Sequence, residues 1–411
     1  MEGSLAAVLD RYEVTVERGF LPERDPLVRF DVDRHDRPVA NYLRTFDRLG
    51  AELPDRLADG SLRPAVESLP TPPDGTFESL MNRETVRLCL LAGFFASGYV
   101  NRIGADPVDR LPAGAAVPLY RTSRRLGRQP ILSYDVLCLH NWRRDEPDES
   151  TEPDTLTEPD TLTEPDTLTE PDTLTEPDRL QAVQQFTHLD DERWFVTIHV
   201  AIEASAGPAL IACERAQRAV REDDADALQS ALETISDSLT DQTAIMKRMT
   251  EKNDPEAFAH RYRPYYEGFD GVVYEGVEAF AGEPQTYRGG SGAQSSVLPS
   301  IDAALGVEHA TTELTEKLTD IRGYMPESHR AVVDAFEAGP DVGPYVVDRD
   351  RPDLTAAHNR CIDALGEFRR VHFGQVIQYI RLVTGETTGT GGTDYMQFLR
   401  VLADETEAQK V

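Results

Sequence analysis

The chain has 411 residues, of which 73 are Asp or Glu and 42 are Lys or Arg, so its formal net charge is −31. This charge argues against nucleic-acid binding as the main activity, because phosphate backbones attract basic surfaces. Hydrophobic residues make up 40% of the sequence, which is enough for one large or two modest cores and argues against a disordered chain.

The basic residues are almost all arginines. Only four lysines, at positions 247, 252, 317 and 410, stand among the 42 basic side chains. An acidic, lysine-poor surface is typical of a salt-adapted protein, because screening at high ionic strength makes the repulsion between many carboxylates tolerable. We therefore expect folding and activity to require salt.

Residues 1–142 are predicted to form a small, mainly helical N-terminal domain. The clearest helix spans 83–99, where apolar residues recur every three to four positions. Proline- and glycine-rich breaks lie at 69–73 and 111–114. No apolar run approaches the roughly 20 residues of a membrane helix. Since the N-terminus also lacks the basic flank of an export signal, we expect a cytoplasmic protein without membrane contact.

A hexapeptide repeat, Thr-Glu-Pro-Asp-Thr-Leu, follows this part of the chain. Four copies start at every sixth residue from Thr151 to Thr169, and an altered fifth copy starts at Thr175. A proline in each unit prevents a regular helix, and one leucine per unit buries too little surface to offset chain ordering. We therefore predict a disordered acidic linker over 143–180, and we favour it over a solenoid. Without residues 151–180 the net charge is still −22, so the acidity extends to the folded parts.

A large helical domain is predicted over 181–411. Three-to-four-residue apolar spacing predicts helices over 194–221, 224–250, 255–263, 297–322, 326–338 and 354–384. Strand-like alternation is scarce, so the predicted fold class is all-α. The four cysteines are far apart among apolar neighbours, which favours reduced core thiols over disulfides or a zinc site.

Two histidines lie on apolar faces of predicted helices. His372 shares a stripe with Phe368 and Val376, and His199 shares one with Phe195. A lone histidine of this kind is usually a hydrogen-bonded core residue, with a metal ligand as the alternative. Two such histidines on separate helices also resemble the two faces of a haem pocket. Spacing alone leaves these interpretations open.

Two glycine-rich loops, 288–296 and 387–394, each precede a helix and would let the backbone approach a ligand closely. Neither has the strand and lysine of a nucleotide P-loop, and flexible surface loops are the alternative. Arg263 is followed by Pro264, which is expected to move it out of helical geometry. Its guanidinium could there pair with a substrate carboxylate, although a solvated surface arginine is also compatible with the sequence.

Together these motifs resemble the indoleamine 2,3-dioxygenases. The matching segments are FRRVHFGQVI at 368–377, GTGGTD at 389–394, GGSGAQSS at 289–296, GVVYEG at 271–276 and YMP at 324–326. The resemblance implies a small helical domain over a large all-α domain that holds haem b. It also implies insertion of O2 across the indole C2–C3 bond of L-tryptophan or a related indoleamine. The product would be N-formylkynurenine, formed in the first step of the kynurenine pathway.

On the cofactor side, the resemblance makes His372 the proximal ligand of the haem iron. Arg369 matches an arginine near a haem propionate, and Asp302 matches that arginine's acidic partner. Ser291 and Gly292 match the loop that lines the haem edge.

On the substrate side, Phe258 matches an aromatic residue that packs on the indole, and Arg263 matches the arginine that takes the substrate carboxylate. Phe195 and Tyr134 match pocket aromatics, and Thr390 matches a threonine that closes over the substrate ammonium. The implied partners are O2, the indole substrate and an electron donor that keeps the haem ferrous. A monomer is expected.

His199 departs from the family pattern, which has serine at this position in the best-known members. By similarity to the tryptophan 2,3-dioxygenases, its imidazole is expected to hydrogen-bond the indole N–H and act in catalysis. It could instead steady bound oxygen or ligate the iron. The alternative functions are a diverged haem protein of the same superfamily with a different indole chemistry, a non-catalytic haem-based sensor, or a plain helical scaffold.

Overall fold

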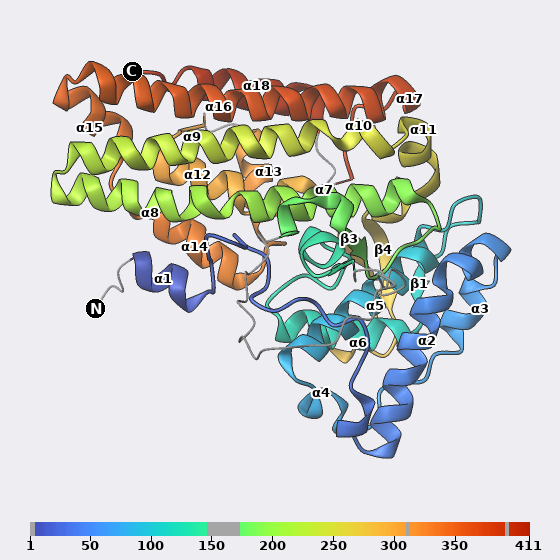
Figure 1. Ribbon diagram of the computed structural model, residues 1–411. Coiled ribbons are helices and arrows are strands. Elements are labelled where there is room, and N and C mark those ends of the chain that lie inside the picture. Colours follow the sequence, from blue (N-terminus) through green and yellow to red (C-terminus); the bar gives the residue numbers. More distant parts are fainter. Residues whose placement is uncertain (1–4, 146–172, 310–312, 391–393) are drawn as a thin grey trace, which may run out of the picture.

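The computed structural model describes residues 5–145, 173–309, 313–390 and 394–411. Helices dominate, as the sequence predicts, and the long ones form a layered bundle beside a group of helices from the N-terminal part (Figure 1). The α-helices are α1 Leu5–Arg11, α2 Arg37–Asp59, α3 Leu62–Glu67, α4 Thr76–Ser79, α5 Asn82–Val100, α6 Ala113–Arg125, α7 Asp190–Ser205, α8 Gly207–Glu222, α9 Ala225–Lys247, α10 Met249–Lys252, α11 Pro255–Ala257, α12 Val297–Leu305, α13 Glu313–Arg322, α14 Glu327–Glu337, α15 Val342–Arg349, α16 Pro352–Val376, α17 Leu382–Thr384 and α18 Tyr395–Glu407.

Short strands tie segments of the described chain together. They are β1 Arg110–Leu111, β2 Trp142–Arg144, β3 Leu180–Ala182, β4 Phe269–Tyr274 and β5 Gln285–Tyr287. β4 pairs in parallel with β1 and antiparallel with β5, and β2 pairs antiparallel with β3. None of them is long enough to form a layer of the core, which is consistent with an all-α fold.

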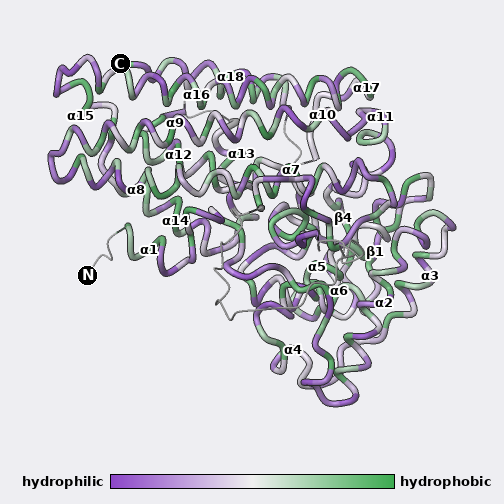
Figure 2. Tube along the Cα trace, viewed as in Figure 1, coloured by the Kyte–Doolittle hydropathy of each residue, from purple (hydrophilic) through white to green (hydrophobic). Residues whose placement is uncertain are grey.

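The long helices α8, α9, α16 and α18 run side by side (Figure 1). Hydrophilic and hydrophobic residues alternate along them, as Figure 2 shows, so each helix turns one face to the interior. Among the described residues, only the stretch Asp190–Glu222 is long and apolar enough to cross a membrane, and 72% of its most apolar window is buried within the protein. Such burial is typical of a core helix.

Two predicted long helices are each divided in the structure. The segment 194–221 breaks at Ala206, and α8 begins at Gly207, where a Cβ would lie 2.2 Å from the carbonyl oxygen of Val16. Only glycine allows that approach of the N-terminal segment. The segment 297–322 breaks at Gly306, which ends α12 with a left-handed φ of 73°.

The buried apolar residues among the first 20 positions lie outside the main apolar cluster of the predicted small domain, 1–142. Leu5, Leu9 and Phe20 are buried in the same apolar cluster as residues of α8, α14 and α16. A second cluster joins α2, α5 and α6 to α7 and α18. The apolar core is therefore continuous across the predicted boundary. The four cysteines are free and buried, as predicted.

The ends of the predicted disordered linker, 143–180, are ordered, which corrects that part of the prediction. Strand β2 begins before it, and β3 starts at Leu180, inside it. Leu174 and Leu180 are fully buried, so leucines of the last repeat copies do find an apolar environment. The central part of the predicted linker, 146–172, lies outside the described residues.

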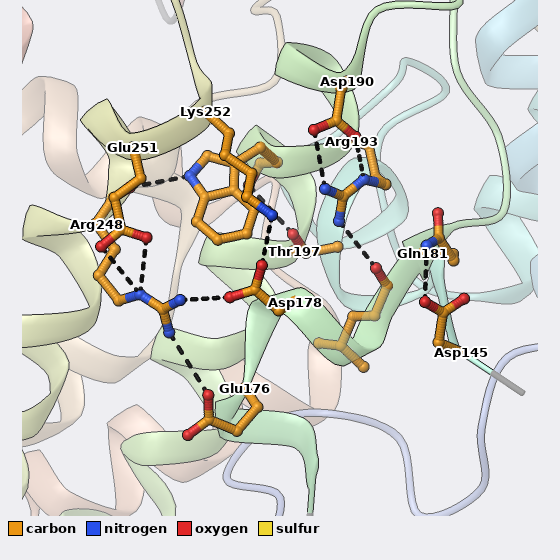
Figure 3. Close-up of polar contacts among 12 residues, drawn as sticks. Asp145, Glu176, Asp178, Gln181, Asp190, Arg193, Thr197, Arg248, Glu251 and Lys252 are labelled. Carbon is orange, nitrogen blue, oxygen red and sulfur yellow. Dashed lines mark hydrogen bonds and ion pairs between the residues drawn. The ribbon is translucent and has the colours of Figure 1, made fainter. Parts of the chain in front are cut away.

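Ion pairs hold the last repeat copy against the corner between α9 and α10 (Figure 3). Asp178 accepts hydrogen bonds from Lys252 and Arg248, both at 2.5 Å, and these contacts lower the pKa of its carboxyl group despite partial burial. Lys252 and Arg248 also lie over the ring of Trp194, at 4.7 and 5.5 Å from its centroid. Trp194 precedes Phe195 of the candidate site, so this network supports the helix that carries the site.

The net charge predicts a salt requirement for stability. We expect the urea midpoint of unfolding to rise as KCl increases from about 0.1 M to about 1 M, because the screening length falls from about 10 Å to about 3 Å. Repulsion between carboxylates then weakens. An unchanged or lower midpoint at the higher salt concentration would contradict salt adaptation of the folded surface.

Candidate functional site

A cavity of about 760 Å³ lies where α7, α9, α12, α16, α18 and the two glycine-rich loops meet. The residues that the sequence selects for a site come from far apart in the chain, and all eleven line this cavity. They are Tyr134, Phe195, His199, Phe258, Arg263, Ser291, Gly292, Asp302, Arg369, His372 and Thr390. The volume is within the range of cofactor and ligand sites.

His372 and His199 reach the cavity from different helices, α16 and α7. Burial, with a smaller contribution from His199, lowers the pKa of His372 to about 4. Burial also lowers the pKa of His199. Both imidazoles are therefore neutral at neutral pH, and the neutral ring is the form that can ligate a metal or accept a hydrogen bond.

The tautomer of His199 follows from its one hydrogen bond in the described chain. Nδ1 lies 2.7 Å from the carbonyl oxygen of Phe195, one turn earlier on α7. A carbonyl only accepts, so Nδ1 carries the proton and donates it. Nε2 of the neutral ring then keeps a lone pair, which makes it an acceptor.

Aromatic rings form one wall of the cavity. Phe195 lies 5.5 Å from Phe258 and 5.6 Å from Tyr266, measured between ring centroids. Phe258 begins a π-helical turn, Phe258–Tyr262, which replaces the predicted continuous helix over 255–263. The wide turn places Phe258 and Arg263 on the same cavity.

Arg263 does not leave helical geometry, which corrects the prediction made from Pro264. Its φ and ψ are −52° and −38°, and the irregular residue is Tyr262, with −139° and −29°. Pro264 sits in the first turn of a 3₁₀ helix, Arg263–Tyr266, where its missing N–H is not needed.

The Arg263 side chain is not at the surface, since it is only 4% exposed. Nη1 donates to Glu386 at 3.0 Å, and Nη2 donates to the carbonyl oxygen of Thr388 at 3.3 Å. Nε has no partner among the described residues. The loop around Thr388 therefore holds the outer end of the guanidinium and leaves one buried donor open.

The two glycine-rich loops contact each other. The Thr390 hydroxyl donates to the carbonyl oxygen of Gly290 at 2.7 Å, and the Gly289 N–H donates to the Thr390 carbonyl oxygen at 3.2 Å. A Cβ at Gly289 would lie 2.0 Å from the carbonyl oxygen of Tyr266, so no other residue fits there. A Cβ at Gly292 would meet no described atom within 4 Å. At Gly292 this loop therefore exposes its backbone to the cavity.

Several lining residues were not selected from the sequence. Glu203 lies one turn after His199 and accepts hydrogen bonds from Ser295 at 2.6 Å and Tyr134 at 2.9 Å. Burial raises the pKa of Glu203 to about 7, although those two hydrogen bonds oppose the rise. Its i+4 spacing from His199 could have revealed it. His309 also lines the cavity, but it lies in a loop beyond α12, where no periodicity marks it.

The cavity fits a haem. Its apolar walls suit a porphyrin, and the neutral His372 suits the iron. At the polar end, the Nε atom of Arg369 is buried and unpartnered among the described residues, which suits a propionate. No group of three or more His, Cys, Asp or Glu side chains in the described ranges could hold a bare metal ion. A haem iron needs fewer, because its ring supplies four ligands.

Comparisons with known proteins give one family. Residues 8–386 match the family described as Indoleamine 2,3-dioxygenase. Indoleamine 2,3-dioxygenase 1 of Rattus norvegicus is 32% identical, over 99% of this chain and 96% of its own length. The Mus musculus protein of the same name is 33% identical over 86% of each chain. A protein named myoglobin, from Haliotis madaka, is 26% identical over 97% of this chain and 98% of its own length.

Proposed function

The chain belongs to the indoleamine 2,3-dioxygenase family of haem-dependent dioxygenases, and we propose that it cleaves the indole ring of L-tryptophan to give N-formylkynurenine. In this reaction the C2–C3 bond of the indole breaks and each carbon gains one atom of O2. No net electrons are consumed. A related indoleamine is the alternative substrate.

His372 would hold the haem through its neutral imidazole, with Arg369 and the loop at Ser291 and Gly292 along the edge of the macrocycle. When bound, the haem supplies a ferrous iron that activates O2. The protein contributes by placing the substrate, excluding water and supplying the counter-charges.

Substrate placement follows from the aromatic wall and Arg263. Phe195 and Phe258 offer faces against which an indole can pack. The open Nε donor of Arg263 can bind the substrate carboxylate in a buried setting, where such a hydrogen bond is strong. Thr390 stands at the same cavity and can approach the ammonium group. These contacts fix which edge of the indole faces the reacting oxygen.

The observation that carries the proposal is the meeting of a buried arginine with an open donor, an aromatic wall and two neutral histidines at one cavity. The test is to purify the protein in high salt, reduce its haem and supply L-tryptophan and air. We expect N-formylkynurenine, identified by mass spectrometry. A haem protein that leaves L-tryptophan unchanged would refute the proposal.

His199 is expected to accept a hydrogen bond from the indole N–H. Nε2 of the neutral ring carries no proton and is an acceptor, so it cannot donate a hydrogen bond to bound oxygen. We predict that His199→Ala lowers kcat/KM for L-tryptophan relative to 1-methyl-L-tryptophan by about tenfold, the value of one lost hydrogen bond. Steady-state kinetics with both substrates give the ratio.

The variant His199→Gln is the matched control, because it keeps a side-chain acceptor and should retain part of the preference. If His199→Ala left the ratio of the two kcat/KM values unchanged, the hydrogen bond between His199 and the indole N–H would be ruled out. Iron ligation by His199 is tested separately with the wild-type ferrous protein. A six-coordinate low-spin absorption spectrum without added ligand would contradict an open site.

The relative named myoglobin supports a second candidate, reversible oxygen binding or sensing without turnover. That function needs neither the aromatic wall nor the open donor of Arg263. A ferrous protein that binds O2 in the presence of L-tryptophan and forms no product would favour it. A product other than N-formylkynurenine would favour a diverged indole chemistry.

A further inference from the structure

A charged cluster on the cavity wall has more hydrogen-bonding capacity than its own members use. It consists of Asp302 from α12, His309 from the following loop, Arg369 from α16 and Glu405 from α18. The first three line the cavity. Asp302 and Arg369 were selected from the sequence, whereas His309 and Glu405 were not.

Arg369 is held at two of its nitrogens. Nη2 donates to Oδ2 of Asp302 at 2.5 Å, and Nη1 donates to the hydroxyl of Thr406 on α18. The side chain is 4% exposed, and its Nε has no partner among the described residues. A buried donor without a partner costs about 1–3 kcal/mol, so this N–H is suited to a ligand in the cavity.

His309 lies between two carboxylates. Its Nδ1 is 3.1 Å from Oε2 of Glu405, and its Nε2 is 3.5 Å from Oδ2 of Asp302. The second contact lacks hydrogen-bond geometry, and Nε2 has no hydrogen-bond partner in the described chain. A carboxylate accepts, so Nδ1 is the donor in the contact with Glu405.

Asp302 remains ionised in this setting. Burial favours its neutral form, but Arg369 and His309 outweigh that effect, so the pKa of its carboxyl group is lowered. The cluster thus has three buried polar atoms without a hydrogen-bond partner in the described chain, which are Nε of Arg369, Nε2 of His309 and Oδ1 of Asp302. The N–H of Arg369 and a proton on Nε2 of His309 would suit the two oxygens of one carboxylate, and a water can satisfy Oδ1 of Asp302.

We propose that His309 and Arg369 together bind one propionate carboxylate of the haem, an inference that rests on the haem binding in the proposed function. His309 is then a cofactor-binding residue. In this contact Nε2 donates to the carboxylate, so binding requires a proton on that nitrogen.

The C-terminal helix α18 takes part in the same site. Glu405 and Thr406 are neighbours on α18, and they fix His309 and Arg369 respectively. Both are positioning residues, because they act on the propionate through the two donors. The last helix of the chain is therefore linked to haem retention.

The test measures the rate of haem transfer from the loaded protein to excess apomyoglobin. Each variant is loaded with haem b and, separately, with haem dimethyl ester, in which both propionates are blocked. We expect His309→Gln to release haem b about tenfold faster, the value of one charge-assisted hydrogen bond. With the dimethyl ester, His309→Gln and wild type should release at the same rate.

Two glutamates on α18 provide a test variant and its matched control. Glu405→Gln should accelerate release of haem b, whereas Glu407→Gln should not, because Glu407 pairs with Arg370 outside the cluster. Equal acceleration with haem b and the dimethyl ester, or none with either, would overturn the propionate contact. Wild-type protein that binds no haem would overturn both this inference and the proposed function. A protein that holds haem without cleaving an indole would overturn only the function.

Discussion

Replacing His372 with alanine is expected to leave a folded protein that does not retain haem. The imidazole is neutral and faces the cavity from α16, and no hydrogen bond with a described residue contributes to its pKa. Loss of the proposed proximal ligand should accelerate haem release at least about 100-fold, or about 2.7 kcal/mol. The measurements are the haem-to-protein absorbance ratio after gel filtration and the transfer rate to apomyoglobin.

His358 provides the control for this prediction. It is buried on the same helix, α16, and does not line the cavity. His358→Ala should therefore keep its haem even if its stability falls. The variant His372→Gly offers a rescue, because added imidazole can occupy the space left by the ring and restore haem binding. Full haem content and activity in His372→Ala would show that the ligand assignment is wrong.

Replacing Arg263 with alanine is expected to raise KM for L-tryptophan strongly while haem content stays normal. A buried, charge-assisted hydrogen bond is worth about 1.5–3 kcal/mol, so kcat/KM should fall about 10- to 100-fold. Glu386 loses its partner in this variant, but its side chain is half-exposed and water can solvate it. Steady-state kinetics and the haem absorbance ratio measure the two effects separately.

Tryptamine distinguishes a carboxylate contact from a general loss of structure, because it lacks the carboxylate. Arg263→Ala should change kcat/KM for tryptamine much less than for L-tryptophan. Arg261→Ala is the matched control, since Arg261 is exposed two residues earlier and does not line the cavity. Equal losses for both substrates would assign Arg263 a structural role.

The helices that carry the histidines were predictable because burial on one face produces a regular spacing. The observed α16, Pro352–Val376, covers most of the predicted helix 354–384, and α7 carries Phe195 and His199 on one cavity-lining face. The helix α2 was missed, although Val39, Leu43 and Phe46 follow the same spacing. The apolar spacing of these residues would have predicted α2 as well.

Other features depend on tertiary contacts that periodicity does not encode. Arg263 keeps helical geometry because a π-helical turn precedes it and Pro264 opens a 3₁₀ turn. The last repeat copy is ordered because Asp178 meets Lys252, more than 70 residues later. His309 joins the site through a loop, and its partners come from α12 and α18. These contacts join segments that are far apart in the chain, so the local sequence does not predict them.

The fate of the oxygen atoms tests the central claim of tryptophan dioxygenation most directly. The reduced haem protein is incubated in high salt with L-tryptophan under ¹⁸O2, and the product is analysed by mass spectrometry. Cleavage of the C2–C3 bond predicts N-formylkynurenine that carries two ¹⁸O atoms, one on the formyl group and one on the ketone attached to the benzene ring. A product with one ¹⁸O atom or none, or tryptophan recovered unchanged, would contradict the account.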